Sequence, residues 1–124
     1  MEHSLLDNIN QERAKVGLPA LTLDPTLCAL SAIRACECSE NFSHTRPNGS
    51  SWLTILEDYD YFIWSATDER IHQGTAGLPE SIIIKGWMRN SDFSASICSE
   101  SYNHIGIGIY TAGSISYIVL LFCG

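Results

Sequence analysis

Histidines and cysteines are the side chains of this chain with the widest chemical repertoire, and His44 has the most distinctive surroundings. It lies in the polar stretch NFSHTRPNGS, residues 41–50, between two hydrophobic segments. Pro47 fixes its own φ, and Asn48-Gly49 is a turn pair because both residues tolerate positive φ. Arg46 precedes the proline and is pushed toward extended geometry. The stretch predicts a rigid bend that aims His44 in one direction, either toward a site or as a cap of the turn itself.

The five cysteines, Cys28, Cys36, Cys38, Cys98 and Cys123, are many for 124 residues. Their spacing fits no zinc template, since a single residue separates the closest two and no second pair follows. One interpretation makes them small core side chains. The other is one or two disulfides that join Cys98 or Cys123 to the 28–38 segment, with at least one thiol left over because the number is odd.

Hydrolysis needs a nucleophile beside a base, or a metal-activated water with a positioned acid. Ser43 adjoins His44 in sequence, but neighbours along a turn seldom meet in that way. The chain also has no Gly-x-Ser-x-Gly nucleophile elbow. Hydrolysis is therefore an alternative and not the first interpretation.

Helices must position His44 in the first half of the chain. Apolar residues at helical spacing predict a helix over residues 3–16, which Gly17 ends. Asp24 followed by Pro25 is a strong helix start and predicts a second helix to about Glu40. Its row of alanines and cysteines would let another element approach closely. Residues 52–56 predict a short third helix.

The second half of the chain combines a helix with strands. Aromatic and β-branched residues predict a strand over 61–66, and Pro79 opens a helix that continues through Met88. Strands over 103–110 and 116–122, joined by a turn at 112–114, predict a hairpin. The expected class is α+β, one domain over residues 1–124 with helices packed on a mostly antiparallel sheet.

The charge balance narrows the classes of partner. Seven Lys and Arg residues stand against 14 Asp and Glu residues, a net charge of −7. This excess disfavours nucleic acid and anionic lipid surfaces. The longest apolar run, residues 117–123, falls short of the roughly 20 residues of a membrane helix. No signal peptide is recognised at the start of the chain, so we expect either a cytoplasmic protein or a mature domain.

Five segments in order resemble a bacterial member of the CAP superfamily, which includes cysteine-rich secretory proteins, antigen 5 and plant pathogenesis-related proteins. The segments are Asn10-Gln-Glu-Arg13, Gly17-Leu-Pro-Ala-Leu-Thr-Leu-Asp24, Phe42-Ser-His-Thr-Arg-Pro-Asn-Gly49, Trp87-Met88 and His104-Ile-Gly-Ile-Gly108. The resemblance spans nearly the whole chain. It implies a three-layer α-β-α sandwich and an extracellular or cell-envelope location, with any signal peptide already removed.

The resemblance also implies a central cleft with two histidines and two acids. The histidines fall on His44 and His104, and the Gly-Glu-Asn-Ile segment of the family falls on residues 68–71, which places a carboxylate at Glu69. The second acid falls on Asn90. The Pro-Gly-His-Arg motif of many bacterial members is here Ser91-Asp-Phe-Ser94.

Two imidazoles and a carboxylate make His44, His104 and Glu69 a candidate Zn²⁺ site with water as fourth ligand, although the fold needs no cofactor. In the alternative, both histidines hydrogen-bond loop carbonyls and only shape the cleft. The other two histidines, His3 and His72, are expected in solvent, with His72 close enough to Glu69 to join the cleft. The three tryptophans are expected to anchor the core.

A secreted or envelope-associated binding module is the expected function, with a lipid, glycan or protein as ligand. A metal-dependent hydrolase and a purely structural adhesion or interaction domain are the alternatives.

Overall fold

A four-stranded sheet lies between two layers of helices in the computed structural model, which describes residues 2–124. The strands are β1 (Thr22–Leu23), β2 (Thr67–Thr75), β3 (His104–Ala112) and β4 (Ile115–Cys123), in the spatial order β1-β3-β4-β2. Only β1 pairs in parallel; β2 and β3 are both antiparallel to β4. The predicted α+β class and mostly antiparallel sheet are therefore confirmed.

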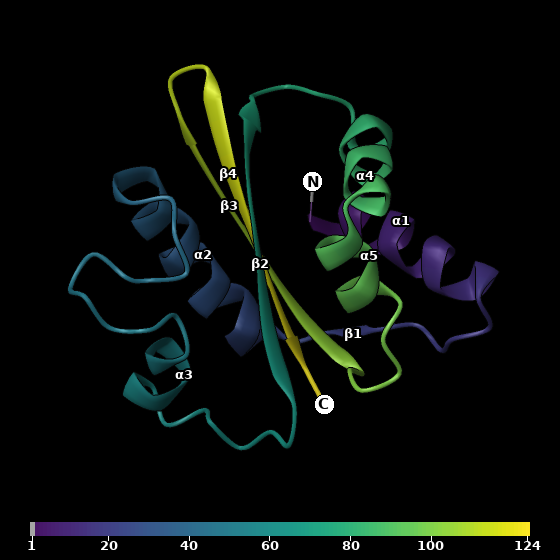
Figure 1. The fold of residues 1–124 in the computed structure, drawn as a ribbon, viewed down its shortest axis with the longest axis horizontal. Coiled ribbons are helices and arrows are strands. Elements are labelled where there is room, and N and C mark those ends of the chain that lie inside the picture. The colour runs from purple at the N-terminus through teal and green to yellow at the C-terminus, as the bar shows by residue number, and fades with distance from the viewer. Residues whose placement is uncertain (1) are drawn as a thin grey trace.

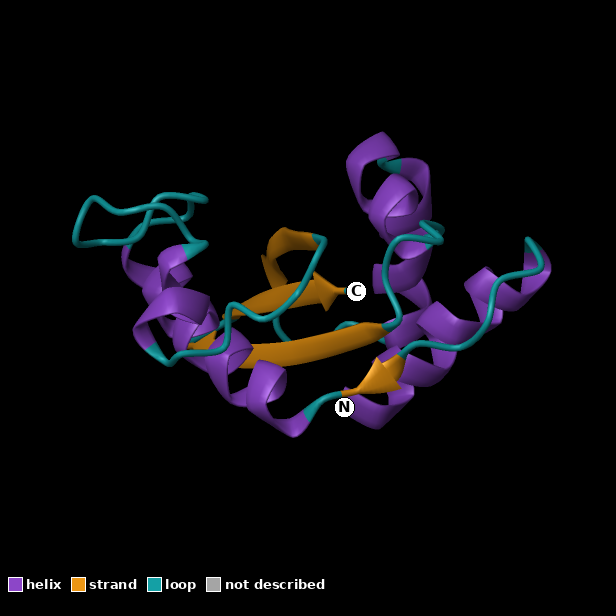
Figure 2. Ribbon diagram, turned by 90° about the horizontal axis from the view of Figure 1, so that it is seen from below, coloured by secondary structure: helices purple, strands orange, loops and turns teal. Residues whose placement is uncertain are grey.

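The helices divide between the two faces of the sheet, as Figures 1 and 2 show. On one face lie α2 (Pro25–Glu40) and α3 (Thr54–Asp58), and on the other lie α1 (Glu2–Lys15), α4 (Glu80–Arg89) and α5 (Ser91–Ile97). Each face has its own hydrophobic core, because alternate residues of β4 point to opposite sides. Val119 and Leu121 belong to the α2 side, and Ile118 and Leu120 to the α4 side.

The helix α2 begins as the sequence predicts and lies very close to the sheet. The Asp24 side chain accepts a hydrogen bond from the Leu27 amide, and Pro25 is the first helical residue. A Cβ atom added at Gly106 or Gly108 of β3 would overlap the α2 backbone, at Leu27 and at Ser31 respectively. These two glycines therefore allow α2 to sit directly on β3.

We expect Gly108→Ala to lower the free energy of unfolding by about 2–3 kcal/mol, because the added methyl group must push α2 off the sheet. The matched control is Gly86→Ala, where the new Cβ meets nothing within 4 Å in the middle of α4. That change should raise stability by about 0.5–1 kcal/mol, since alanine is the better helix former. Urea denaturation of both variants checks the pair, and equal effects would contradict the close contact.

One predicted element differs from the structure, and two further elements were not predicted. Residues 61–66 form no strand; the strand of this region starts at Thr67, where its backbone begins to pair with β4. The aromatic side chains of 61–66 make local contacts, and Phe62 and Ile63 are largely exposed. The two-residue β1 and the whole of α5 were not predicted from the sequence.

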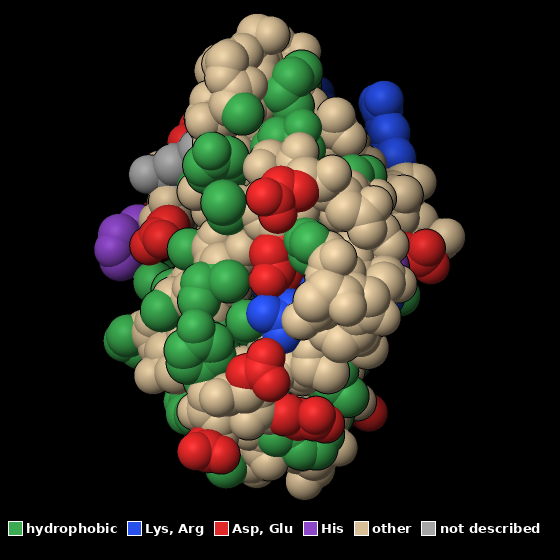
Figure 3. Space-filling model, turned by 90° about the vertical axis from the view of Figure 1, so that its left-hand side faces the viewer, with side chains coloured by type: hydrophobic (Ala, Val, Ile, Leu, Met, Phe, Trp, Pro, Cys, Tyr) green, Lys and Arg blue, Asp and Glu red, His purple; other side chains and the backbone are tan. Residues whose placement is uncertain are grey.

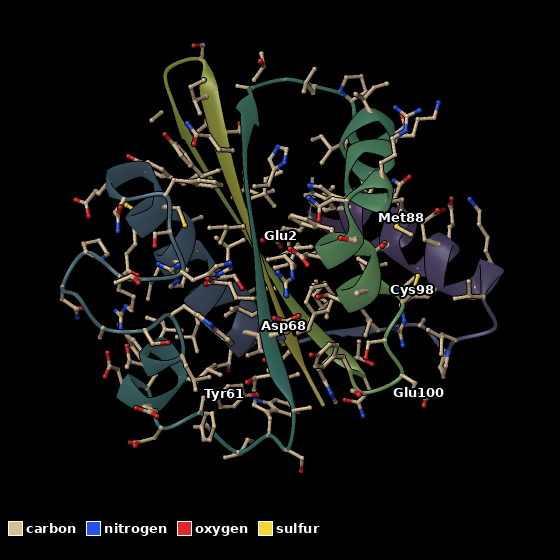
Figure 4. All side chains as sticks on the ribbon, viewed as in Figure 1. Glu2, Tyr61, Asp68, Met88, Cys98 and Glu100 are labelled. Atoms are coloured by element: carbon tan, nitrogen blue, oxygen red, sulfur yellow. The ribbon has the colours of Figure 1, made fainter. Side chains whose placement is uncertain are left out.

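All five thiols are free, which removes the disulfide interpretation. Cys98 lies on the side of α1 and α5, whereas Cys28, Cys36 and Cys38 lie on α2 across the sheet (Figure 4). A bond between Cys98 and that segment would have to cross the sheet. Cys38 and Cys123 are buried side chains of the α2-side core, as the core interpretation predicts.

Thiol titration of the unfolded, unreduced protein should therefore count five groups. In the native protein we expect Cys36 to react first, because it is exposed. Cys123 should react last, because burial raises its pKa to about 12 and only the thiolate is reactive. Fewer than five groups after unfolding, or fast native labelling of Cys123, would contradict this arrangement.

Candidate functional site

A fully buried ion pair joins α2 to the edge strand β2. The Arg34 Nε donates to Glu69 Oε2 at 2.7 Å, and Nη2 donates to Glu69 Oε1 at 3.0 Å. Neither side chain is exposed. Burial by itself lowers the pKa of Arg34, but the hydrogen bond and charge of Glu69 outweigh it and leave the pKa above its ordinary value. The two hydrogen bonds from Arg34 fix the orientation of the Glu69 side chain.

His44 reaches this carboxylate from the bend after α2. Its Nδ1 lies 2.8 Å from Glu69 Oε1, and half of the His44 side chain is exposed. A carboxylate only accepts, so His44 Nδ1 carries a proton and donates to Glu69. The predicted bend is present: Gly49 has a φ of 88°, and the Gly49 amide donates to the Arg46 carbonyl at 2.8 Å.

A second arginine ties the bend to α2 and α3. Arg46 is almost fully buried and bonds both oxygens of Glu37, and it reaches Asp58 at 2.8 Å. Glu37 also accepts from Arg34, so the two arginines share one carboxylate. Burial tends to raise the pKa of Glu37, but its bonds to Arg46 and Arg34 leave that pKa below its ordinary value. This network holds His44 over Glu69.

A shallow depression of about 380 Å³ opens beside the His44–Glu69 pair. Its walls are His44, Trp52, Asp68, Glu69 and Arg70. Asp68 and Arg70 stand where the family segment has glycine and asparagine. They pair at 3.1 Å, and both bond Ser96 of α5, so this departure ties β2 to the helix layer of α1, α4 and α5.

The other predicted site residues lie elsewhere. His104 is on β3, separated from β2 by β4, and its register partner is Cys123, whereas that of Glu69 is Leu121. The His104 ring packs against Trp64 at 5.0 Å and bonds the Asn103 side chain. Asn90 caps α5, where its side chain accepts from two amides. The structure brings together His44 and Glu69, but not His104 or Asn90.

An apolar groove runs between β2 and α4, mainly on the other face of the sheet from Glu69, and Phe42 and Ile71 extend it past the edge strand to the α2 side. It consists of two cavities of about 360 and 500 Å³ that share His72, Leu78 and Ile83. We call it the β2–α4 groove. Its remaining walls include Phe42, Ile71, Ile82, Trp87, Asn90 and Phe93 at one end, and Pro79, Glu80, Ile109, Thr111, Ser116 and Ile118 at the other.

His72 lies in the wall of this groove and is not a solvent residue, which corrects the sequence expectation. It cannot join Glu69, because residues three apart on a strand point to opposite faces. Its Nδ1 accepts a hydrogen bond from the Trp87 indole at 3.1 Å. Burial lowers the pKa of His72.

Sequence reasoning missed Arg34, Arg46 and His72. The signal for Arg34 and Glu37 was available: two opposite charges three residues apart in a helix otherwise lined with small and apolar residues. Nothing comparable marked His72, because its partner Trp87 is brought to it only by tertiary packing.

The sequence pattern of the cysteine-rich secretory protein family (CAP) matches residues 6–123, nearly the whole chain. This chain belongs to the CAP family. The protein YkwD of Bacillus subtilis is 27% identical over 92% of the chain, and the chain spans 44% of YkwD. The match to the family confirms the resemblance that the ordered segments indicated.

Solved structures support the CAP fold. An outer surface protein of Borrelia burgdorferi superimposes with a TM-score of 0.85 at 22% identity, covering 98% of this chain and 90% of that one. An extracellular protein with an SCP domain from Bacillus anthracis gives a TM-score of 0.82 at 18% identity, over 98% of this chain and 39% of that one.

The residues of this CAP domain do not fit a resident Zn²⁺. A relative, NaASP2, has been crystallised with Zn²⁺; it is 12% identical, with a TM-score of 0.68 over 97% of this chain and 77% of that one. Across residues 2–124, no three His, Cys, Asp or Glu side chains gather into a group that could hold a metal ion. His44 and Glu69 supply two ligands where zinc takes four, and Arg34 already occupies both Glu69 oxygens.

Removing Glu69 should be among the most destabilising changes in this CAP domain. We expect Glu69→Ala to cost about 3–5 kcal/mol, because it leaves the buried Arg34 charge without its main partner. The double variant Arg34→Met/Glu69→Leu should recover most of this loss. The control Glu12→Ala breaks an exposed pair with Lys15 and should cost less than about 1 kcal/mol. Urea denaturation measures all three; a small effect of Glu69→Ala would contradict the role of the pair.

Proposed function

We propose that this CAP domain is an extracellular binding module that takes up a lipid-like ligand in the β2–α4 groove. One observation carries the proposal: two cavities of about 360 and 500 Å³ adjoin along shared walls, which makes an elongated space lined mainly by apolar side chains. Such a space suits an extended hydrocarbon chain, and its volume is in the range of small-molecule sites.

The rim of the groove supports uptake from outside. Phe42, Leu78 and Ile82 line it and have exposed fractions of 45%, 37% and 51%. Apolar side chains left exposed around an apolar hollow are typical of a binding surface. The floor is Trp87 and Phe93, whose rings stack at 4.9 Å.

A glycan or a nucleic acid suits these surfaces less well. Sugars need many polar partners, and the groove lining is mostly hydrocarbon. The net charge of −7, with acidic side chains along the face over α2 and α3 (Figure 3), repels phosphates.

Hydrolysis is less well supported than binding, because across residues 2–124 His44 hydrogen-bonds Glu69 and no hydroxyl or thiol. That arrangement lacks the nucleophile beside a base that hydrolysis would need. A purely structural adhesion or interaction domain, the other alternative, would leave the groove without a ligand.

Family membership and two relatives support the location outside the cell. The Borrelia relative is an outer surface protein and the Bacillus anthracis relative is extracellular. In residues 2–124 no helix has the length and apolar character to cross a membrane. We propose that this domain works outside the cell or at the cell envelope.

Binding of cis-parinaric methyl ester, a fluorescent long-chain probe, tests the proposal. We expect saturable fluorescence enhancement, and about a tenfold loss of affinity in Ile82→Asp, which places a charge on the rim. The matched control is Ile63→Asp, which changes an isoleucine that is 69% exposed outside the groove. Absence of binding, or equal losses in the two variants, would overturn the proposal.

A further inference from the structure

His72 is the polar group best placed to orient a ligand in the β2–α4 groove. It lies on β2 opposite Ile118 and faces the α4 side of the sheet. It lines both cavities, so its ring stands where they join. A ligand that extends through both cavities must pass this ring.

The partner of its Nδ1 fixes the tautomer of the ring. An indole N–H can only donate, so the Nδ1 that accepts from Trp87 at 3.1 Å carries no proton. In the neutral ring the proton is then on Nε2, and Nε2 is a donor. Burial favours this neutral form. Among the described residues Nε2 has no hydrogen-bond partner, and it is not one of the buried unpaired atoms, so this donor is open to the groove.

Gly74 keeps the space around this donor clear. A Cβ atom at position 74 would lie 2.9 Å from His72 Nε2 and 3.3 Å from Cε1. Glycine is therefore needed at this position to leave room for the His72 ring, and its backbone conformation would accept other residues. An alanine would cover Nε2 or displace the ring.

Two other polar sites of the groove already have partners within the protein, whereas the side chains of Gln73 and Thr75, which also line it, are exposed to solvent. The Asn90 oxygen accepts from the amides of α5, and the hydroxyls of Thr111 and Ser116 bond each other at 3.0 Å. Neither lysine nor arginine is among the residues that line the two cavities, whereas Glu80 lies at one end. A free carboxylate would meet one negative charge there and no positive one.

We propose that His72 Nε2–H orients the ligand by donating a hydrogen bond to an uncharged oxygen, so that the groove selects neutral lipids over free fatty acids. This inference rests on the proposed function and adds the chemistry of the ligand's head. Ester and amide carbonyls and hydroxyl groups are the suitable acceptors.

The experiment compares cis-parinaric acid with its methyl ester at neutral pH, in the wild type and three variants. The two probes share one chain, so the ratio of their affinities isolates the head group. We expect the wild type to bind the ester about tenfold more tightly. His72→Phe keeps the ring volume but loses the donor, and should weaken ester binding about fivefold and shrink the ratio. Gly74→Ala keeps the histidine and should act in the same direction, and the control His104→Phe should change neither.

The outcomes separate the inference from the proposed function. Ester binding that is unchanged in both His72→Phe and Gly74→Ala would overturn the role of His72 and leave the groove as the binding site. Tighter binding of the acid than of the ester would overturn the selectivity. Failure of the wild type to bind either probe would overturn both. Nitrogen NMR of the ring gives a reading without ligand: a proton on Nε2 is expected, and one on Nδ1 would overturn the inference.

Discussion

The buried Arg34–Glu69 pair is the interaction on which the arrangement of the site depends. Two charges without solvent are tolerated only where their polar atoms are satisfied. Arg34 meets this condition through Glu69, Glu37 and the Ser43 carbonyl, which belong to the edge strand, to α2 itself and to the bend. Nearer the start of α2, Gly106 and Gly108 of β3 allow the helix backbone to pack directly against the sheet. A helix held at both places cannot slide by a turn, so His44 keeps its position over Glu69.

The alternation of side chains along β2 separates two surfaces that the sequence places close together. Glu69 points to the α2 side and His72 to the α4 side. One edge strand thus contributes Glu69 to a polar depression and His72 to an apolar groove, and Ile71 lines the groove from the α2 side. Substitutions on the two faces share few partners, and their effects on stability should be close to additive. Binding in the groove can therefore be altered without loss of the ion pair that holds the fold.

The sequence predicted elements better than it predicted contacts. Three local signals predicted element boundaries to within a residue or two: Asp24-Pro25 and Pro79 for the starts of helices, and residues 112–114 for the hairpin turn. The strand at 67–75 was not predicted, because its residues are mostly polar and it forms only by pairing with β4. His44 was placed near Glu69 by family resemblance. His104 was placed there too, but β4 separates its strand from β2. No local signal reports how many strands lie between two residues.

Phe93 and His72 are best understood together. Phe93 stands where many bacterial members carry the histidine of Pro-Gly-His-Arg, and its ring stacks on Trp87 at 4.9 Å. A phenyl ring offers no lone pair to a metal ion and adds an apolar surface to the floor of the groove. The indole N–H of Trp87 still needs an acceptor, because a buried donor left unpaired is costly. It finds that acceptor in His72 on the strand, and the remaining N–H of the imidazole then faces the groove. With an aromatic ring at position 93, the imidazole of this region belongs to the strand and presents a donor where a metal ion would need an acceptor.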